Sequence, residues 1–439
     1  MKATFSDIIG YQSIKEELKQ IADALKNADD YAKLGVKTPR GLMLYGDPGL
    51  GKTLMATALA EESGLPVFLC RKTKSAGRFV DEITETFKKA TEAAPAIVYL
   101  DDIDKFANAD ENHRDAEEYV TVQACIDEVK DKNVFVLATA NDVRKLPRSL
   151  MRVGRFDRVI EVEAPHGEDA REIIRHYLDQ KQTMDDLDYE LIARIMDGRS
   201  CAELETVINE AGMYAVYDRS EKITTEHFLK ACLRIVYKMN YTGDPDDYDD
   251  DDDEDYAAIR AGSTLERVAY HEAAHAVVNE VLLPGSVTLS TVCAGNDGSG
   301  GLTSYRRQGV EPGYLQCCRA VTSLAGMAVS EQVFGVCDMG SSHDLDMAFR
   351  LVKGMVGDLC SNGLGFYSFG YHESPENTRR VEEATTAEVE RFYRKAKEVL
   401  AQNRAFLDVL AKRLMEKRLI TCRDIEELRK TCKVVSVAL

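Results

Sequence analysis

Two histidines separated by three residues, with a glutamate directly after the first, lie in the stretch VAYHEAAHAVV, residues 268–278. If the stretch is helical, His271 and His275 lie on one face about 6 Å apart along the axis, so both imidazoles can bind one metal ion. Glu272 is rotated by about 100° and lies beside that ion, where it can act as general base toward a water that the metal activates. The pattern predicts a catalytic zinc site.

The alternative is a core helix whose two histidines are held by hydrogen bonds alone. The chain contains only eight histidines, and the use of two of them at this spacing favours the metal site. A zinc site nevertheless needs a further protein ligand. Apolar neighbours would bury the helix in either case; they are Val268, Ala269, Ala273, Ala274, Val277 and Val278.

A second stretch that could do chemistry is GDPGLGKT, which satisfies the phosphate-loop pattern G-x-x-x-x-G-K-[ST]. It lies between an apolar segment, 41–45, that predicts a strand and a segment with helical periodicity, an order that argues against a chance glycine-rich turn. Its glycines let backbone N–H groups face phosphates, and the helix that follows presents its positive end. Lys52 would reach the terminal phosphates and Thr53 would hold Mg²⁺. The predicted nucleotide loop consists of Gly46, Asp47, Pro48, Gly49, Leu50, Gly51, Lys52 and Thr53.

Two further predicted strands end in polar side chains. An apolar strand over 96–100 is followed by Asp101 and Asp102, and the segment 134–142 carries Asn141 near its end. Asp101 suits Mg²⁺ coordination, Asp102 suits polarisation of the attacking water, and Asn141 could contact the γ-phosphate or that water. Strands that alternate with helices and carry polar residues at their ends predict a doubly wound α/β domain with a parallel sheet.

Four segments come in the order and spacing of an AAA ATPase module and most closely resemble the FtsH family: FSDIIGYQSIKEELKQ, GDPGLGKT, YLDDID and SLMRVGRFDR. The resemblance implies that Arg152 and Arg155 act in trans as arginine fingers on the nucleotide of a neighbouring subunit, within a homo-hexameric ring. It also implies a helical lid over 166–240. A surface ion pair of the arginines with Asp157 is the alternative.

The chain departs from the family at two places in the ATPase. The family has glutamate where this chain has Asp102, and a carboxylate displaced by about 1 Å can cost on the order of 100-fold in rate. The sequence therefore predicts binding of ATP and Mg²⁺ and leaves the rate of hydrolysis open. The second departure is GRFVDE, in the loop that grips substrate in the family. Phe79 is the predicted gripping aromatic, with packing inside the domain as the alternative.

The segment MGSSHDLDMAFRLVKGMV resembles the FtsH peptidase segment whose aspartate is the third zinc ligand, which corresponds here to Asp344. His343 is by residue type the better ligand but occupies a non-ligand position of the family, and Asp346 is a further competitor. Ser341 or Ser342 would cap the helix that begins here. Two histidines and one carboxylate leave the fourth position of a tetrahedral zinc open for water, as in catalytic sites, so we expect one Zn²⁺ per subunit.

Other parts of the second half also resemble the family. GNDGSGGLTSYRRQ, residues 295–308, resembles a short strand near the active site, to which an extended substrate could add by β-pairing. The C-terminal segment has helical periodicity and resembles the closing helices of the family, so a mostly α-helical zinc metallopeptidase domain is expected. Ala274 replaces the usual glycine, a change that we do not expect to remove zinc.

The charge pattern indicates a domain boundary at an acidic run and argues against a nucleic-acid partner. The chain has 439 residues, of which 44% are hydrophobic and 30% charged, as in globular proteins. A net charge of −19 argues against a nucleic-acid partner. Ten of the twelve residues at 244–255 are acidic, which predicts a solvated linker rather than a core, although it could also loosen domain coupling or bind a basic partner. The predicted domains are an AAA large subdomain at 1–165, a helical lid at 166–240, an acidic linker at 241–262 and a zinc metallopeptidase domain at 263–439.

Several features bear on location. The chain has no apolar run of about 18 residues and no secretion signal at its start. Its eleven cysteines are scattered without a CxxC pair, which is typical of reduced thiols. FtsH proteins usually carry membrane spans before the ATPase, whereas here the ATPase begins almost at Met1. We predict a cytoplasmic enzyme without a membrane span, recruited to a membrane only through a partner.

Together these patterns predict an ATP-dependent zinc metalloendopeptidase that unfolds, translocates and degrades polypeptides. Two rival hypotheses stay open. One is an AAA unfoldase or remodeller without proteolysis. The other is a peptidase that binds ATP for assembly but hydrolyses it very slowly because of Asp102.

Overall fold

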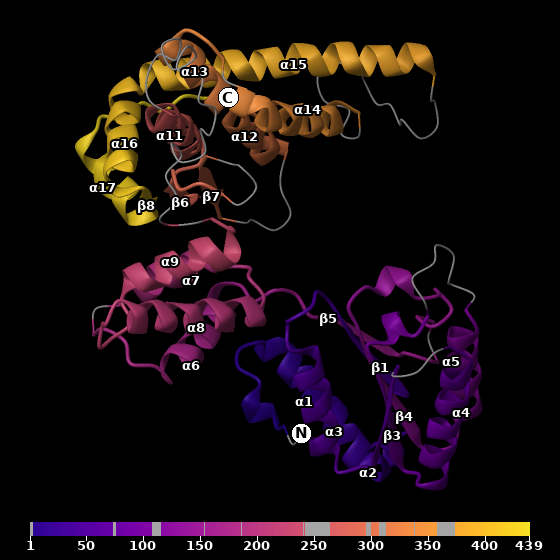
Figure 1. Ribbon diagram of the computed structural model, residues 1–439. Helices are drawn as coiled ribbons and strands as arrows, with labels where there is room; N and C mark the ends of the chain where they lie inside the picture. The colour runs from indigo at the N-terminus through magenta and orange to yellow at the C-terminus, as the bar shows by residue number, and fades with distance from the viewer. Residues whose placement is uncertain are drawn as a thin grey trace. The chain divides into compact units, whose positions relative to one another are not determined.

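The protein is seen here as a computed structural model (Figure 1). The structure describes residues 3–72, 76–107, 116–152, 154–185, 187–239, 241, 264–295, 300–306, 313–337, 339–357 and 374–439. These residues form two compact units. The first comprises residues 1–183 and 196–212, and the second comprises residues 184–195 and 213–439.

A five-stranded parallel sheet forms the centre of the first unit, with the strand order β2-β3-β4-β1-β5. Its strands are β1 (Gly41–Tyr45), β2 (Val67–Arg71), β3 (Ala96–Asp101), β4 (Val134–Ala140) and β5 (Arg158–Glu161). Every residue of β3 and β4 is buried, because helices cover both faces of the sheet. The doubly wound α/β prediction is confirmed. The expected strand at 134–142 ends earlier, at Ala140.

The helices of this unit flank the sheet. Figure 1 shows α1 and α3 on one side of the strands and α4 and α5 on the other. The elements outside the sheet are η1 (Phe5–Asp7), α1 (Gln12–Lys26), α2 (Ala28–Lys33), α3 (Lys52–Ser63), α4 (Ala76–Glu92), η2 (Ile103–Lys105), α5 (Glu117–Glu128) and η4 (Val143–Lys145). Because the carboxyl ends of parallel strands meet at one edge, the segments after β1, β3 and β4 lie side by side there.

The lid segment is helical, as expected. Its helices are α6 (Gly167–Leu178), α7 (Tyr189–Ile195), α8 (Cys201–Tyr217) and α9 (Thr225–Val236). Helix α6 and the first part of α8 belong to the first unit, whereas α7 and α9 belong to the second. The segment is therefore shared between the two compact units.

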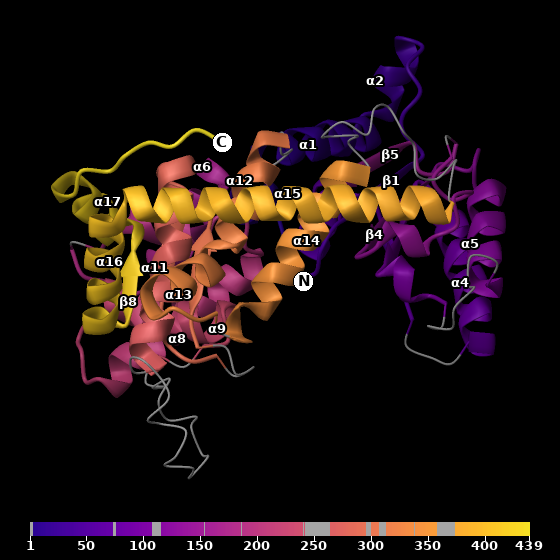
Figure 2. The ribbon, with the colours of Figure 1, turned by 90° about the horizontal axis from the view of Figure 1, so that it is seen from above.

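The second unit is mostly helical around a small antiparallel sheet of strand order β7-β6-β8. Its elements are α11 (Thr264–Leu282), β6 (Val287–Thr291), β7 (Leu302–Tyr305), α12 (Gly313–Ser323), α13 (Ala325–Phe334), η6 (Met339–Ser341), α14 (Ser342–Gly357), α15 (Pro375–Gln402), α16 (Arg404–Lys417), β8 (Leu419–Thr421) and α17 (Cys422–Thr431). The long helix α15 runs past α13 and α14 (Figure 2). The prediction of a mostly helical peptidase domain is confirmed.

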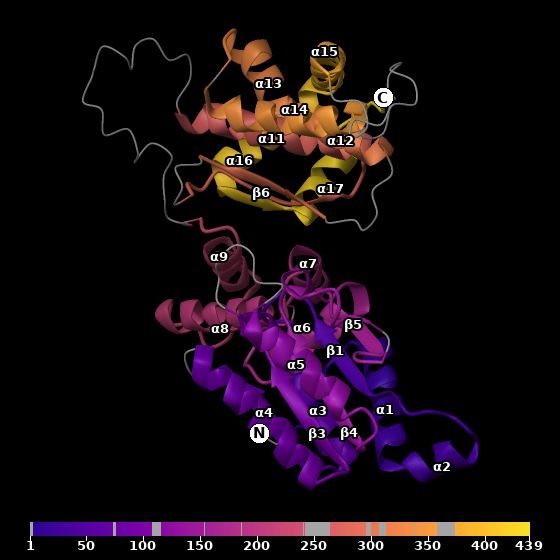
Figure 3. The ribbon, with the colours of Figure 1, turned by 90° about the vertical axis from the view of Figure 1, so that its right-hand side faces the viewer.

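Helix α11, which carries both predicted zinc histidines, is the centre of this unit. It packs against α12, α13, α16 and the sheet, and Figure 3 shows it lying over β6. Small side chains let these elements approach closely, since Ala269, Ala273 and Ala274 are fully buried. Burial on all sides of the helix fixes the direction in which each of its polar side chains points.

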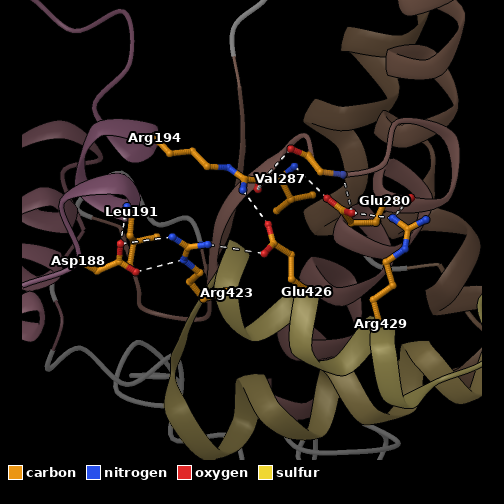
Figure 4. A network of polar contacts seen from close by, with 9 residues as sticks. Asp188, Leu191, Arg194, Glu280, Val287, Arg423, Glu426 and Arg429 are labelled. Carbon is orange, nitrogen blue, oxygen red and sulfur yellow. Dashed lines mark hydrogen bonds and ion pairs between the residues drawn. The ribbon is translucent and has the colours of Figure 1, made fainter. Parts of the chain in front are cut away.

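Charged side chains tie helix α7 to the rest of the second unit (Figure 4). Arg423 of α17 donates to Asp188 with an N–O distance of 3.1 Å. Arg194 of α7 pairs with Glu426 of α17 at 2.9 Å and donates to the carbonyl oxygen of Val287 at 3.1 Å. These contacts connect a lid helix with the start of β6.

A buried carboxylate stabilises the turn between α11 and β6. Glu280 is only 3% exposed and accepts hydrogen bonds from the backbone amides of Gly285 and Val287. Arg429 donates to its carboxylate at 3.0 Å (Figure 4). The charge is therefore both paired and hydrogen-bonded, as a buried carboxylate requires.

The structure bears on the expected lack of membrane spans and on the cysteines, but not on the acidic linker. In the described ranges no helix has the length and apolar character needed to cross a membrane. The cysteines in these ranges are all free thiols. The acidic run at 244–255 lies outside the described residues.

Candidate metal centre and nucleotide site

The structure brings His271, His275 and Asp344 together. One helical turn of α11 separates the histidines, and Asp344 lies in the first turn of α14. The two Nε2 atoms are 3.1 Å apart, and each lies 3.1 Å from Oδ2 of Asp344. A point about 2 Å from all three corners of such a triangle lies just above its plane, and this is the distance at which zinc binds imidazole and carboxylate. The three donors therefore fit one zinc ion.

Hydrogen bonding orients the imidazole of His275 for metal binding. Its Nδ1 lies 2.8 Å from the carbonyl oxygen of Thr322. Since a carbonyl only accepts, Nδ1 must carry a proton, so in the neutral ring the lone pair of Nε2 faces the other two donors. Sequence reasoning did not find Thr322, because it lies 47 residues away along the chain.

Asp344 sets the electrostatics of this triad. Burial alone would lower the pKa of His275, but the hydrogen bond and charge of Asp344 outweigh it and raise the pKa to about 9. Burial alone would raise the pKa of Asp344, but the hydrogen bonds from His271 and His275 outweigh it and hold the pKa below its usual range. The carboxylate therefore stays ionised and attracts positive charge to the two Nε2 atoms.

A glycine on α13 makes room for the ring of His271. A Cβ atom at Gly326 would lie 2.2 Å from Cε1 and 2.5 Å from Nδ1 of His271. No side chain can occupy that space while the imidazole keeps its position. Gly326 was not found from the sequence, because only the fold brings α13 against α11.

Glu272 lies beside the triad without joining it. It is 6% exposed, and its charge is one of the causes that raise the pKa of His275. Thr303 of β7 donates to its Oε2 at 2.7 Å. Within the described ranges, only His271, His275 and Asp344 are grouped closely enough to hold a metal ion. Glu272 is thus outside the metal group, with its carboxylate held by Thr303.

The competing ligands are placed elsewhere. His343 is exposed, and Asp346 forms an ion pair with Arg350 one turn further along α14. The expected serine cap is wrong for Ser341, whose buried hydroxyl has no hydrogen-bond partner among the described residues. Helix α14 begins at Ser342, directly after the 3-10 turn η6.

The phosphate-loop pattern forms a turn between β1 and α3. Gly49 and Gly51 have φ angles of 81° and 88°, which side chains rarely adopt, and α3 begins at Lys52. The ammonium of Lys52 donates to the carbonyl oxygens of Gly46 and Asp47, both at 2.7 Å. Burial lowers the pKa of Lys52, and nearby carboxylates offset part of this. The amino group is thus held over the loop where phosphates would bind.

Asp101 is the last residue of β3 and Asp102 follows it, and the two carboxylates are held differently. Asp101 is 3% exposed and accepts from the hydroxyls of Tyr99 and Thr139 at 2.9 and 2.8 Å. Asp102 accepts from Asn141 at 3.3 Å and pairs with the side chain of Lys105 at 2.7 Å. The structure therefore brings Asn141 next to Asp102, because β3 and β4 are neighbouring parallel strands.

The two candidate arginine fingers have different surroundings. Arg155 pairs with Asp127 at 2.6 Å and donates to Gln123 at 2.9 Å. Arg152 is exposed and has no side-chain partner among the described residues. The alternative pairing with Asp157 is not what the structure shows, since Asp157 accepts backbone amides instead.

Phe79 is not an exposed gripping residue. Its ring is fully buried and packs edge-on against Phe106, with centroids 4.8 Å apart. The prediction is wrong because α4 begins at Ala76 and directs Phe79 into the core of the first unit. Residues 73–75, just before this helix, lie outside the described part of the chain.

Three segments of the chain match known families. Residues 42–164 match the ATPase family associated with various cellular activities (AAA), and residues 186–230 match the AAA+ lid domain. Residues 263–428 match Peptidase family M41. The first match covers the nucleotide loop, and the last covers the metal triad. By fold and site the protein is thus an AAA module followed by a metallopeptidase domain.

Similarity to whole proteins extends along nearly the entire chain. An ATP-dependent zinc metalloprotease FtsH of Chloroflexus aggregans is 30% identical over 99% of this chain and 69% of its own length. FtsH 3 of Synechocystis sp. is 30% identical over 97% of this chain and 73% of its own length. The chain spans 63% of the length of the Rhodothermus marinus FtsH, to which it is also 30% identical. The chain belongs to the FtsH family of ATP-dependent zinc metalloproteases.

Proposed function

We propose that the protein is an ATP-dependent zinc metalloendopeptidase that unfolds, translocates and degrades polypeptides. The observation that carries the proposal is the triangle of His271, His275 and Asp344, with the carboxylate of Glu272 beside it. Two imidazoles and one carboxylate form the donor set of a catalytic zinc site, because they leave a coordination position open.

The chemistry assigned to these residues is hydrolysis of a peptide bond. Zinc, when bound, would act as a Lewis acid that makes a neighbouring water more acidic and polarises the substrate carbonyl. Glu272 takes a proton from the attacking water while the water oxygen bonds to the carbonyl carbon of the substrate. It returns that proton to the amide nitrogen as the C–N bond breaks, so one water is consumed and a new carboxyl and amino terminus form.

ATP would supply the force for unfolding and translocation. Lys52 would hold the terminal phosphates, and Thr53 and Asp101 would hold Mg²⁺. Asp102 would polarise the attacking water. The amide of Asn141 donates to the carboxylate of Asp102 at 3.3 Å. The exposed Arg152 supports a role in trans on a neighbouring subunit, and hence a homo-hexameric ring, with Arg155 as the second arginine. The free thiols support a reducing compartment, so we place the enzyme in the cytoplasm.

The proposal is tested with unfolded, fluorescently labelled casein. We expect the purified chain to bind one zinc per subunit and to degrade casein with ATP, at a much lower rate without ATP. The chelator 1,10-phenanthroline should stop degradation, and added Zn²⁺ should restore it, because the three ligands supply the only metal group found in the described ranges.

His343→Ala serves as the matched control, since it removes an exposed histidine next to Asp344 without touching the triad. It should keep zinc and activity. A chain that contains no zinc and leaves casein intact, yet unfolds a labelled protein with ATP, would contradict the peptidase proposal and favour a remodeller.

A peptidase that binds ATP but hydrolyses it very slowly is the second candidate, and Asp102 is the observation that favours it. Its carboxylate is one methylene shorter than that of glutamate and is engaged by Lys105 at 2.7 Å. We expect Asp102→Glu to raise phosphate release by on the order of 100-fold if this candidate is right, because the longer side chain reaches the water. Equal rates of phosphate release in the two proteins would reject it.

A further inference from the structure

We propose that Thr303 is a positioning residue that fixes the general base Glu272 for the reaction. The inference rests on the proposed peptidase function and concerns how the chain orients the base. Thr303 lies on β7, the strand at one edge of the small sheet, whereas Glu272 lies on α11. The family resemblance places the segment 295–308 near the active site, but it does not assign a contact between Thr303 and Glu272.

The single hydroxyl proton of Thr303 has two acceptors on Glu272 within reach, and the carboxylate oxygen is the nearer one. Oγ1 of Thr303 lies 2.7 Å from Oε2 and 3.1 Å from the backbone carbonyl oxygen of Glu272. Because an ionised carboxylate only accepts, the hydroxyl must be the donor. Both side chains are at least nine-tenths buried, so water does not compete for this contact.

A second hydroxyl holds the first one in that orientation. Ser290 of β6 is fully buried and faces Thr303 across the sheet, with an oxygen–oxygen distance of 2.9 Å. With the proton of Thr303 directed at Glu272, the hydroxyl of Ser290 donates to Thr303. The hydroxyl of Ser290 thus donates to that of Thr303, and the hydroxyl of Thr303 donates to Glu272.

The contact at Oε2 leaves the other carboxylate oxygen for proton transfer. A Cβ atom at Gly301 would lie 2.9 Å from Oε1 of Glu272, so only a glycine leaves space beside that oxygen. Oε2 is therefore engaged by Thr303, whereas Oε1 lies close to the backbone of Gly301 and accepts no hydrogen bond from the described residues. One oxygen fixes the carboxylate and the other remains to accept the proton of the attacking water.

The residue after Thr303 points to the opposite face of the strand, away from Glu272. The next residue, Ser304, shares a hydrogen bond of 2.8 Å with the hydroxyl of Tyr237, and its carbonyl accepts from Thr288. Successive residues of a strand point to opposite faces, so these contacts leave the Thr303 side free for Glu272. Ser304 therefore offers a matched control position on the same strand.

The test compares Thr303→Val, Thr303→Ser and Ser304→Ala in casein degradation by the full chain. Removal of a group that orients a reacting residue typically costs 10- to 100-fold, so we expect Thr303→Val to lower kcat by roughly 10- to 100-fold at an unchanged KM. Thr303→Ser keeps the donating hydroxyl and should recover most of the wild-type kcat. Ser304→Ala should match the wild type.

Zinc content and thermal melting are measured in the same samples and should not differ between Thr303→Val and Thr303→Ser. An unchanged kcat in Thr303→Val, or a serine variant as slow as the valine variant, would overturn the inference. Loss of zinc in Thr303→Val would also overturn it, because Thr303 would then support the metal site as a whole. A wild-type chain without zinc-dependent cleavage would instead contradict the proposed function, and this inference with it.

Discussion

Glu272→Gln is expected to lower the rate of casein cleavage by roughly 100- to 10,000-fold, the range that a general base contributes. Glutamine has nearly the same shape as glutamate, and its amide oxygen can still accept the hydrogen bond of Thr303, but it cannot take a proton from water. The rate is measured by release of labelled peptides with saturating ATP. The loss should appear in kcat.

Zinc binding and ATP turnover are the internal controls for this variant. Glu272 is not one of the three clustered donors, so zinc content should remain at one per subunit. Glu266→Gln, in the first turn of the same helix, should cleave casein at the wild-type rate. If Glu272→Gln cleaved as fast as the wild type, a different group would have to be the base.

Short-range periodicity is the part of the site that the sequence could predict. Helical geometry alone places His271, Glu272 and His275 within one turn, so their relation needs no knowledge of the fold. The phosphate loop is equally local, because its glycines, its lysine and the helix that follows are consecutive. The strand pattern also placed Asp102 and Asn141 at strand ends, whereas their hydrogen bond is seen only in the structure.

The remaining parts of the site depend on packing between distant segments. Gly326 and Thr322 lie about 50 residues from the histidines that they contact, and the meaning of each depends on which helix packs against α11. Thr303 faces Glu272 only because of the register between β6 and β7. Asp344 was identified by family resemblance, since spacing alone left His343 and Asp346 as competitors.

Phe79 is a case in which a local sequence pattern predicted a substrate-gripping residue, but the side chain is buried in the core. An aromatic followed by an apolar residue resembles a gripping loop, but the same pair is typical of the buried face of a helix. The structure places Phe79 against Phe106 in the core. Periodicity over the whole of 76–92 carries more information than the three residues that resemble the family.

Lys52→Met is expected to lower ATP hydrolysis by roughly 100- to 1,000-fold, the cost of removing one fixed donor that stabilises developing charge. The ammonium of Lys52 is held by two loop carbonyls, and no other lysine donates to this loop among the described residues. Phosphate release gives the rate. ATP-dependent degradation of casein should stop with it, whereas cleavage of a short unstructured peptide should continue.

Because Lys52→Met should stop casein degradation but not cleavage of the short peptide, it tests how ATP hydrolysis is linked to proteolysis. Lys52 belongs to the first compact unit and the metal triad to the second, so the substitution leaves every atom of the peptidase site unchanged. Lys88→Met, an exposed change on α4, is the matched control and should leave both activities intact. Loss of peptide cleavage in Lys52→Met would mean that nucleotide binding assembles the peptidase site itself. Continued peptide cleavage would mean that ATP serves only to deliver the chain to a site that is already formed.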